Sequence, residues 1–132
     1  VTILSGAALL VRRSIFEKAG GFDPAIFLYH EDDDLALRLC KNYGKLYYVY
    51  DALVMHMEGR SSERTPETAA LKAWHMGRSR VYATKKHDRP MPFTHALIMA
   101  LMQLLSIDVI IFRRKRAKQL AYLRGVISSW HF

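Results

Sequence analysis

The sequence predicts an α/β fold, in which a mixed region of strands and helices is followed by helices alone. In the first half, short apolar runs typical of strands alternate with segments whose apolar residues lie four apart, as in helices. The second half carries only helical patterns, separated by a proline-rich break. With 132 residues, of which 51% are hydrophobic, the chain can bury one modest core, which excludes a disordered polypeptide.

Three short runs in the first half have the composition of strands. The first is continuous and apolar, and the other two are rich in Tyr, Val and aliphatic residues, which suit a pleated and partly buried surface. These strands are predicted at residues 6–11, 45–50 and 52–55.

Two helices are expected between these strands. Ser14 can cap the first helix, and Gly20-Gly21 ends it, because glycine readily adopts the left-handed conformation that follows many helices. The second begins at about Glu31 and runs to about Tyr43. Within it, Asp34 and Arg38 stand four residues apart and can pair, which is worth only ~0.3 to 0.5 kcal/mol if the pair is exposed.

The second half is expected to contain long helices. Thr65 and Pro66 form a cap followed by proline at the first helical position, and a helix extends from there to about Lys86. The segment Arg89-Pro90-Met91-Pro92 breaks it. A mostly apolar stretch then covers residues 93–112, and a basic helix continues from Arg113 to about Ser128.

The charge of the chain is unevenly distributed. Residues 1–59 hold six Lys and Arg against eight Asp and Glu, whereas residues 60–132 hold fourteen against four, within a net charge of +8. The two parts are therefore expected to have different partners. The single cysteine, Cys40, excludes an internal disulfide, and the chain has no initiator Met, so a fragment of a longer protein is expected.

The run Glu31-Asp32-Asp33-Asp34 is the most informative motif. Like charges this close resist joint ionisation unless a cation, a helix N-terminus or solvent relieves them. A solvated acidic helix start is the alternative to a functional site. Three further motifs accompany the acidic run. Gly20-Gly21-Phe22-Asp23 precedes it in the sequence. The other two are Ser5-Gly6-Ala7, before the first strand, and Val54-Met55-His56-Met57-Glu58-Gly59, after the last strand.

This order of motifs resembles the second half of family 2 inverting glycosyltransferases of the GT-A fold, particularly bacterial rhamnosyltransferase-like members. The family pattern, an aromatic stretch followed by Glu-Asp-x-Asp-Leu-x-x-Arg, is met by Tyr29, the acidic run, Leu35 and Arg38. The resemblance is close over about residues 3–62. It implies an acceptor-side C-terminal portion of a GT-A nucleotide-diphospho-sugar transferase fold at residues 1–65, followed by a basic and apolar helical extension at 66–132.

The resemblance also implies a role for individual residues. Asp32, with Glu31 beside it, is the candidate general base that removes a proton from the acceptor hydroxyl. Asp33 is expected to be exposed. The residues expected to contact substrate are Gly6, Ala7, Tyr29, Arg78 and Arg80, and those expected to be structural are Asp34, Arg38, Gly20 and Gly21.

A divalent metal, Mn²⁺ or Mg²⁺, is implied as cofactor, with His56 as a ligand; an imidazole suits Mn²⁺ better than Mg²⁺. The triplet Asp32-Asp33-Asp34 formally matches the Asp-x-Asp metal motif of these enzymes. That motif normally ends a strand ahead of the Ser-Gly-Ala segment, so we reject the triplet as the metal site. The true motif and most of the donor site are expected upstream, and this chain alone is expected to be inactive.

The implied activity is transfer of a sugar from a nucleotide-diphospho-sugar to an acceptor hydroxyl with inversion, in cell-surface polysaccharide synthesis. The expected partners are a nucleotide-sugar donor, a saccharide or lipid-linked acceptor, and an anionic membrane surface. Residues 93–112 are expected to pack on the domain or lie at the interface, and the cations after them suit lipid headgroups. A cytoplasmic position, peripheral to the inner face of the cell membrane, and self-association are expected.

The alternative is a non-catalytic module whose basic helices bind a membrane or a polyanion. Nucleic acid is not expected as a partner, because the sequence shows no helix-turn-helix, RRM or zinc-binding pattern.

Overall fold

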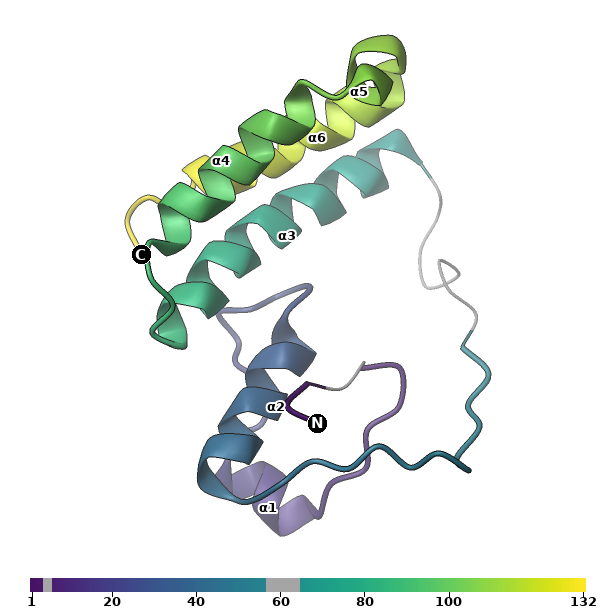
Figure 1. The fold of residues 1–132 in the computed structure, drawn as a ribbon, viewed down its shortest axis with the longest axis vertical. Coiled ribbons are helices and arrows are strands. Elements are labelled where there is room, and N and C mark those ends of the chain that lie inside the picture. The colour runs from purple at the N-terminus through teal and green to yellow at the C-terminus, as the bar shows by residue number, and fades with distance from the viewer. Residues whose placement is uncertain (4–5, 57–64) are drawn as a thin grey trace. The chain divides into compact units, whose positions relative to one another are not determined.

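The computed structural model describes residues 1–3, 6–56 and 65–132, and every regular element in these ranges is a helix (Figure 1). The predicted strands at 6–11, 45–50 and 52–55 are not formed, so the α/β class and its GT-A portion are not confirmed. A strand needs a neighbour to pair its N–H and C=O groups, and the described residues supply none. The tyrosines and valine of residues 47–50 are accordingly exposed.

The contacts divide the chain into two units, residues 1–58 and 59–132. The first contains α1 (Arg13–Lys18) and α2 (Glu31–Asn42), joined by irregular segments. The expected cap at Ser14 is wrong, because α1 begins at Arg13 and its N-cap, Arg12, makes no side-chain cap bond. The predicted glycine stop is formed, since Gly20 and Gly21 both have positive φ, at 81° and 65°.

The second unit contains α3 (Pro66–Lys86), α4 (Pro92–Leu104), α5 (Ile107–Ile111) and α6 (Arg113–Ile127). The predicted cap of α3 is formed, because the Thr65 hydroxyl accepts a hydrogen bond from the Thr68 N–H at 3.1 Å. The apolar stretch 93–112 is divided into α4 and α5 where Ser106 takes an extended conformation. No helix in the described ranges combines the length and the apolar composition needed to cross a membrane.

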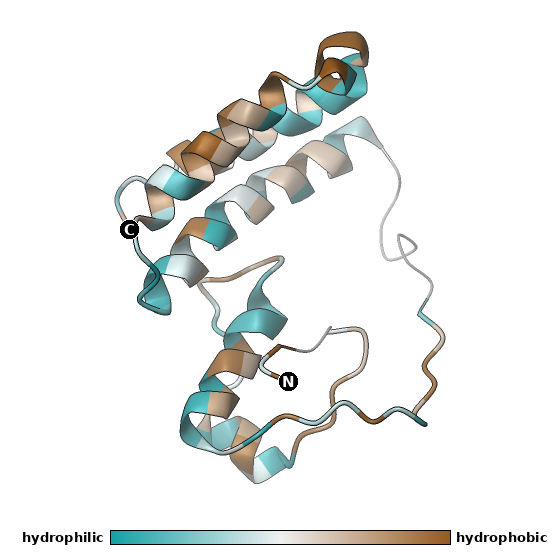
Figure 2. Ribbon diagram, in the orientation of Figure 1, coloured by the Kyte–Doolittle hydropathy of each residue, from teal (hydrophilic) through white to brown (hydrophobic). Residues whose placement is uncertain are grey.

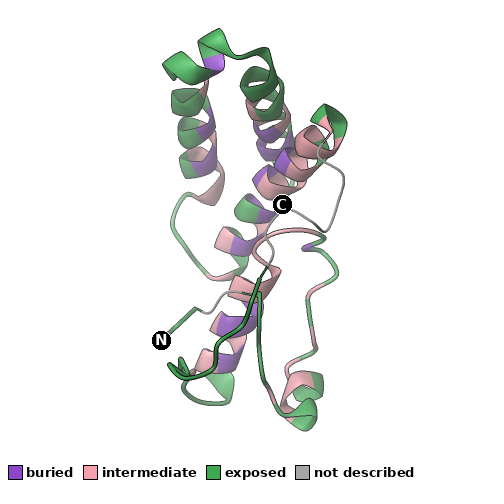
Figure 3. Cartoon of the chain, turned by 90° about the vertical axis from the view of Figure 1, so that its right-hand side faces the viewer, coloured by how far each residue is buried: buried purple, intermediate pink, exposed green. Residues whose placement is uncertain are grey.

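Three helices of this unit, α3, α4 and α6, enclose its core, as the buried faces in Figure 3 show. The backbones of α3 and α6 approach closely at two glycines. A Cβ atom at Gly77 would overlap the Tyr122 carbonyl oxygen of α6, and one at Gly125 would overlap the Trp74 carbonyl of α3. The buried core residues are Ala73, Val81, Ala96, Ala100, Tyr122 and Val126.

Candidate active site

The acidic residues at the start of α2 follow two residues with an unusual backbone. Tyr29 and His30 have φ values of 65° and 67°, in the left-handed region that non-glycine residues seldom occupy. Such conformations cost of order 1–3 kcal/mol each and are concentrated at functional sites. Sequence reasoning missed this pair, and the one available signal was that His is enriched in this region.

Asp32 is held by backbone amides from two parts of the first unit. Its Oδ2 accepts a hydrogen bond from the Gly6 N–H at 2.7 Å, and its Oδ1 accepts one from the Asp33 N–H at 3.0 Å. A Cβ atom at Gly6 would lie 2.9 Å from Oδ2, so the absence of a side chain permits this approach. The fold thus joins two of the predicted site residues, and each oxygen keeps a lone pair for a further donor.

Glu31 has a buried oxygen that the chain leaves unsatisfied. Among the described residues, no hydrogen-bond donor reaches its Oε2 atom. Buried polar atoms in folded proteins nearly always have a partner, because losing hydration without one costs free energy.

Asp34 and Arg38 form the predicted pair, but in a buried position. The Asp34 side chain has no exposed surface, and its Oδ2 accepts hydrogen bonds from Arg38 Nη2 at 2.8 Å and Nε at 2.9 Å. Arg38 also donates to the carbonyl oxygens of Gly21, at 2.7 Å, and of Ala19. The estimate for an exposed pair therefore does not apply, and Arg38 fastens α2 to the glycine turn that ends α1.

Asp33 was expected to be exposed and is instead half-buried. Its Oδ2 lies 3.0 Å from His30 Nδ1, and its side chain is only 35% exposed. The left-handed conformation of His30 allows its ring to reach the first turn of the helix. Of the other predicted substrate contacts in this unit, Tyr29 is half-buried and Ala7 is exposed.

The residues that could bind a metal do not form a complete site. Within residues 1–3, 6–56 and 65–132, no three His, Cys, Asp or Glu side chains are grouped as metal ligands would be. His56 is exposed, whereas the three aspartates contact groups of the protein itself. Met57, Glu58 and Gly59, which complete the predicted motif, lie outside the described residues, as does Ser5. The divalent metal stays a prediction, and no step proposed below depends on it.

Arg78 and Arg80 occupy different environments in the second unit. Arg78 is half-buried, and its guanidinium lies 5.5 Å from the ring centre of Trp74 and 5.2 Å from that of Phe132. Such cation–π contacts stabilise a fold. Arg80 is exposed, and its side chain lines a pocket. Of the two residues, Arg80 is the one that lines a pocket, and both substrate contacts stay predictions.

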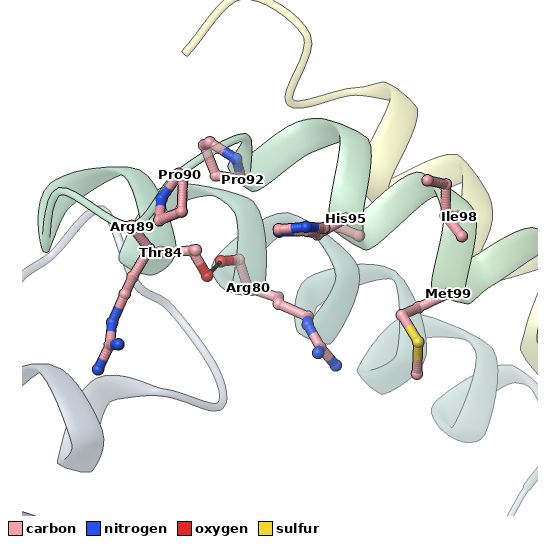
Figure 4. Close-up of a pocket in the computed structure, with 9 residues that line it drawn as sticks. Arg80, Thr84, Arg89, Pro90, Pro92, His95, Ile98 and Met99 are labelled. Carbon is pink, nitrogen blue, oxygen red and sulfur yellow. Dashed lines mark hydrogen bonds between the residues drawn. The ribbon is translucent and has the colours of Figure 1, made fainter.

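The pocket lies where α3 ends and α4 begins and has a volume of about 470 Å³ (Figure 4). Its lining combines Arg80, Arg89 and His95 with apolar side chains, and no acidic residue lines it. Sequence reasoning missed Arg89 and His95, because only the turn between the two helices brings them to Arg80. The remaining lining residues are Thr84, Pro90, Pro92, Ala96, Ile98 and Met99.

Sequence comparison identifies homologues of the chain. It is 36% identical over 126 residues to N-acetylglucosaminyl-diphospho-decaprenol L-rhamnosyltransferase of Mycobacterium tuberculosis, in strains CDC 1551 and H37Rv. It is 33% identical over 92 residues to rhamnosyltransferase WbbL of Escherichia coli K12. These homologues confirm the resemblance to rhamnosyltransferases.

The matches cover much of this chain but a minor part of each relative. They span 92% of the chain and 40% of the mycobacterial enzymes, and 64% of the chain and 34% of the Escherichia coli protein. The chain thus spans well under half the length of these curated relatives. No protein-family model matches the chain, and no solved structure matches it significantly.

Proposed function

We propose that this chain is the acceptor-side part of a glycosyltransferase that acts in cell-surface polysaccharide synthesis, because its homologues are rhamnosyltransferases. The enzyme transfers a sugar from a nucleotide-diphospho-sugar to an acceptor hydroxyl, with inversion at the anomeric carbon. Asp32 of the first unit supplies the general base, and the second unit carries a basic pocket of its own.

In the proposed reaction, Asp32 takes the proton of the acceptor hydroxyl. The hydroxyl oxygen forms a bond to the anomeric carbon, while the bond from that carbon to the nucleotide diphosphate breaks and the diphosphate leaves with the electron pair. Attack from the face opposite the leaving group inverts the configuration. The Gly6 and Asp33 amides support this role, because they hold the carboxylate in one orientation and leave lone pairs free.

The observation that carries the proposal is the position of Asp32, whose two carboxylate oxygens are held by the Gly6 and Asp33 amides at the start of α2. A sugar acceptor presents several hydroxyl groups. One of them can donate to an oxygen of Asp32, whose carboxylate the two amides already orient. A purely solvated acidic helix start does not require a carboxylate that is held by the amide of a residue as distant in the sequence as Gly6.

We further propose that the acceptor is a saccharide linked to a lipid through a diphosphate, the chemistry that the name of the mycobacterial relative describes. In the pocket of the second unit, Arg80 and Arg89 can bind phosphate oxygens through charge-assisted hydrogen bonds. Ile98 and Met99 offer apolar contact to the first part of the lipid. The volume of the pocket, about 470 Å³, lies in the range of small-molecule sites, roughly 300–1,000 Å³.

The base is tested in the whole enzyme with Asp32→Asn, which keeps the size of the side chain but removes the base. We expect kcat to fall by ~10²-fold or more, with a smaller effect on the KM of the donor. Asp33→Asn is the matched control, because that side chain contacts only His30 among the described side chains. An essential Asp33 with a dispensable Asp32 would contradict the assignment.

The acceptor contacts are tested by steady-state kinetics of the double variant Arg80→Gln/Arg89→Gln. The KM for the lipid-linked acceptor should rise by about tenfold or more, because two charge-assisted contacts are lost, whereas the KM of the donor should stay unchanged. Lys85→Gln removes a nearby exposed charge outside the pocket and is the control. An equal effect on donor and acceptor would show that the pocket does not bind the acceptor.

A further inference from the structure

The helix α4 carries two apolar faces, and only one of them enters the core. Ala96 and Ala100 are buried against α3 and α6. The opposite side carries a second apolar stripe at spacings of three and four residues, as on one face of a helix, and its members are between 47% and 78% exposed. This stripe consists of Ile98, Leu101, Met102 and Leu105.

The short helix α5 and the residue after it extend the exposed apolar surface. Their large side chains are between 52% and 73% exposed, and only Val109 faces inward. Figure 2 shows hydrophobic residues along α4 and across α5. A contiguous exposed patch of this kind marks an interaction site, because isolated apolar side chains are common on surfaces but clusters are not. The exposed members are Ile107, Ile110, Ile111 and Phe112.

A cluster of cations follows this apolar surface directly. Five exposed basic residues occupy the first turns of α6, and Asp108, the only acid in residues 92–132, is already bound by Lys115 at 2.6 Å. Cations at a helix N-terminus are unfavourable within the chain, since they oppose the helix dipole. Their position is explained if an external anion neutralises them. The five are Arg113, Arg114, Lys115, Arg116 and Lys118.

We propose that these residues form a docking surface for an anionic phospholipid bilayer. The apolar side chains of α4 and α5 enter the boundary between headgroups and acyl chains, with both helices lying along the membrane plane, and the cations of α6 contact lipid phosphates. The inner face of α4 remains in the protein core. The inference goes beyond the proposed reaction, since it concerns a surface that does not include the base and shares only Ile98 with the lining of the diphosphate pocket.

The combination of charge and apolar area selects this partner over two others. A nucleic acid would satisfy the cations but leave the isoleucines of α5 in water. A second copy of the chain could cover the apolar surface, but a symmetric interface would bring the basic turns of the two copies together. An anionic membrane supplies both an apolar interior and negative phosphates at its surface.

Sedimentation of the 132-residue chain with phospholipid vesicles tests the proposal. We expect binding to vesicles of phosphatidylcholine with phosphatidylglycerol and at least tenfold weaker binding to phosphatidylcholine alone. Ile110→Gln/Ile111→Gln and Arg113→Gln/Arg114→Gln should each weaken binding to the anionic vesicles by about tenfold or more. The controls are Leu71→Gln, an exposed leucine on α3, and Lys41→Gln/Lys45→Gln, which removes two exposed charges from the first unit.

Each outcome decides for or against the proposal. Circular dichroism first confirms that all variants keep their helices, as expected because the substituted side chains are exposed. Loss of vesicle binding in both test variants, but in neither control, supports docking through apolar and basic residues together. Unchanged binding of the Ile110→Gln/Ile111→Gln variant would overturn it in favour of a purely electrostatic contact. A dimer in light scattering that Ile110→Gln/Ile111→Gln abolishes, without vesicle binding, would identify a second copy instead.

Discussion

Two helices of this chain each begin with four charged residues of one sign, and the helix dipole has opposite effects on the two sets of charges. α2 opens with the acids 31–34, and α6 opens with the bases 113–116. Negative side chains at a helix N-terminus are favoured by the helix dipole, whereas positive side chains there are disfavoured. The dipole of α2 thus stabilises its acidic start, and the dipole of α6 destabilises its basic start.

The two starts also differ in where their contacts lie. The aspartates of α2 bind groups of the same unit: the Gly6 amide, the His30 ring and the Arg38 guanidinium. The bases of α6 are all exposed, and in the described part of the chain the one carboxylate that contacts them is Asp108. Charges that agree with the dipole and have internal partners build the fold and its site. Charges that oppose it and face solvent indicate a partner outside the chain.

The largest effect is expected where the acidic start is buried. Arg38→Met removes the arginine partner of the buried Asp34 carboxylate and should lower the free energy of unfolding of the first unit by about 3–5 kcal/mol. Urea denaturation followed by circular dichroism, with hydrogen exchange of the α2 amides, measures this. Arg13→Met removes an arginine with the same spacing to an acid, but the Arg13 side chain is 91% exposed, so stability should barely change. Equal effects would show that burial does not distinguish the pairs.

The next effect concerns the amide that holds Asp32. Gly6→Ala places a methyl group 2.9 Å from Asp32 Oδ2, so the carboxylate must move. Displacement of the base should lower kcat of the whole enzyme by roughly 10- to 100-fold. Ala8→Ser, at an exposed position in the same segment, is the control. Steady-state kinetics with a saturating donor make the comparison. If Gly6→Ala kept full activity, the Gly6–Asp32 bond would not be part of the working site.

Reversing the basic start should separate stability from docking. Arg113→Glu/Arg114→Glu replaces cations that oppose the helix dipole with acids that agree with it, and should stabilise the second unit by about 0.3–1 kcal/mol per site. The same variant should lose binding to anionic vesicles. Thermal denaturation and vesicle sedimentation on one preparation measure both properties. A loss of stability would mean that the cations have intramolecular partners that matter to the fold.

The smallest effect is expected for Asp108→Asn. The Lys115–Asp108 pair is short, at 2.6 Å, but both side chains are more than half exposed. Its loss should cost no more than about 1 kcal/mol, and the cost should shrink further at high salt, because exposed ion pairs are screened. Thermal denaturation at low and high ionic strength gives the two values. A large effect that persists at high salt would place this pair with the buried pair of α2.

The helices were predictable because their signals are local. The cap at Thr65, the prolines at residues 90 and 92 and the glycines after α1 act on their immediate neighbours, so both ends of α3, the start of α4 and the end of α1 follow from short stretches of sequence. The strands were not predictable in the same way. A strand forms only when another segment pairs with it, and composition does not reveal whether such a segment is within reach.

In the candidate site, too, local features were predictable and features that depend on packing were not. The spacing of Asp34 and Arg38 predicted their ion pair, but its burial and the hydrogen bond from Arg38 to Gly21 depend on how α1 and α2 pack. The bond between Gly6 and Asp32 likewise joins residues that lie 26 positions apart in the sequence. Asp33 was placed wrongly because the left-handed backbone of His30 carries no strong sequence signal.

The contact between α3 and α6 at Gly77 and Gly125 has an evolutionary consequence. At these two points main chain meets main chain, so the register of the helices is set by atoms that every residue shares. Neighbouring core residues such as Val81 and Val126 can exchange for others of similar volume while the helices keep their crossing. Glycine at both positions should therefore outlast the surrounding sequence, and diverged relatives that retain this helix pair should be recognisable by it.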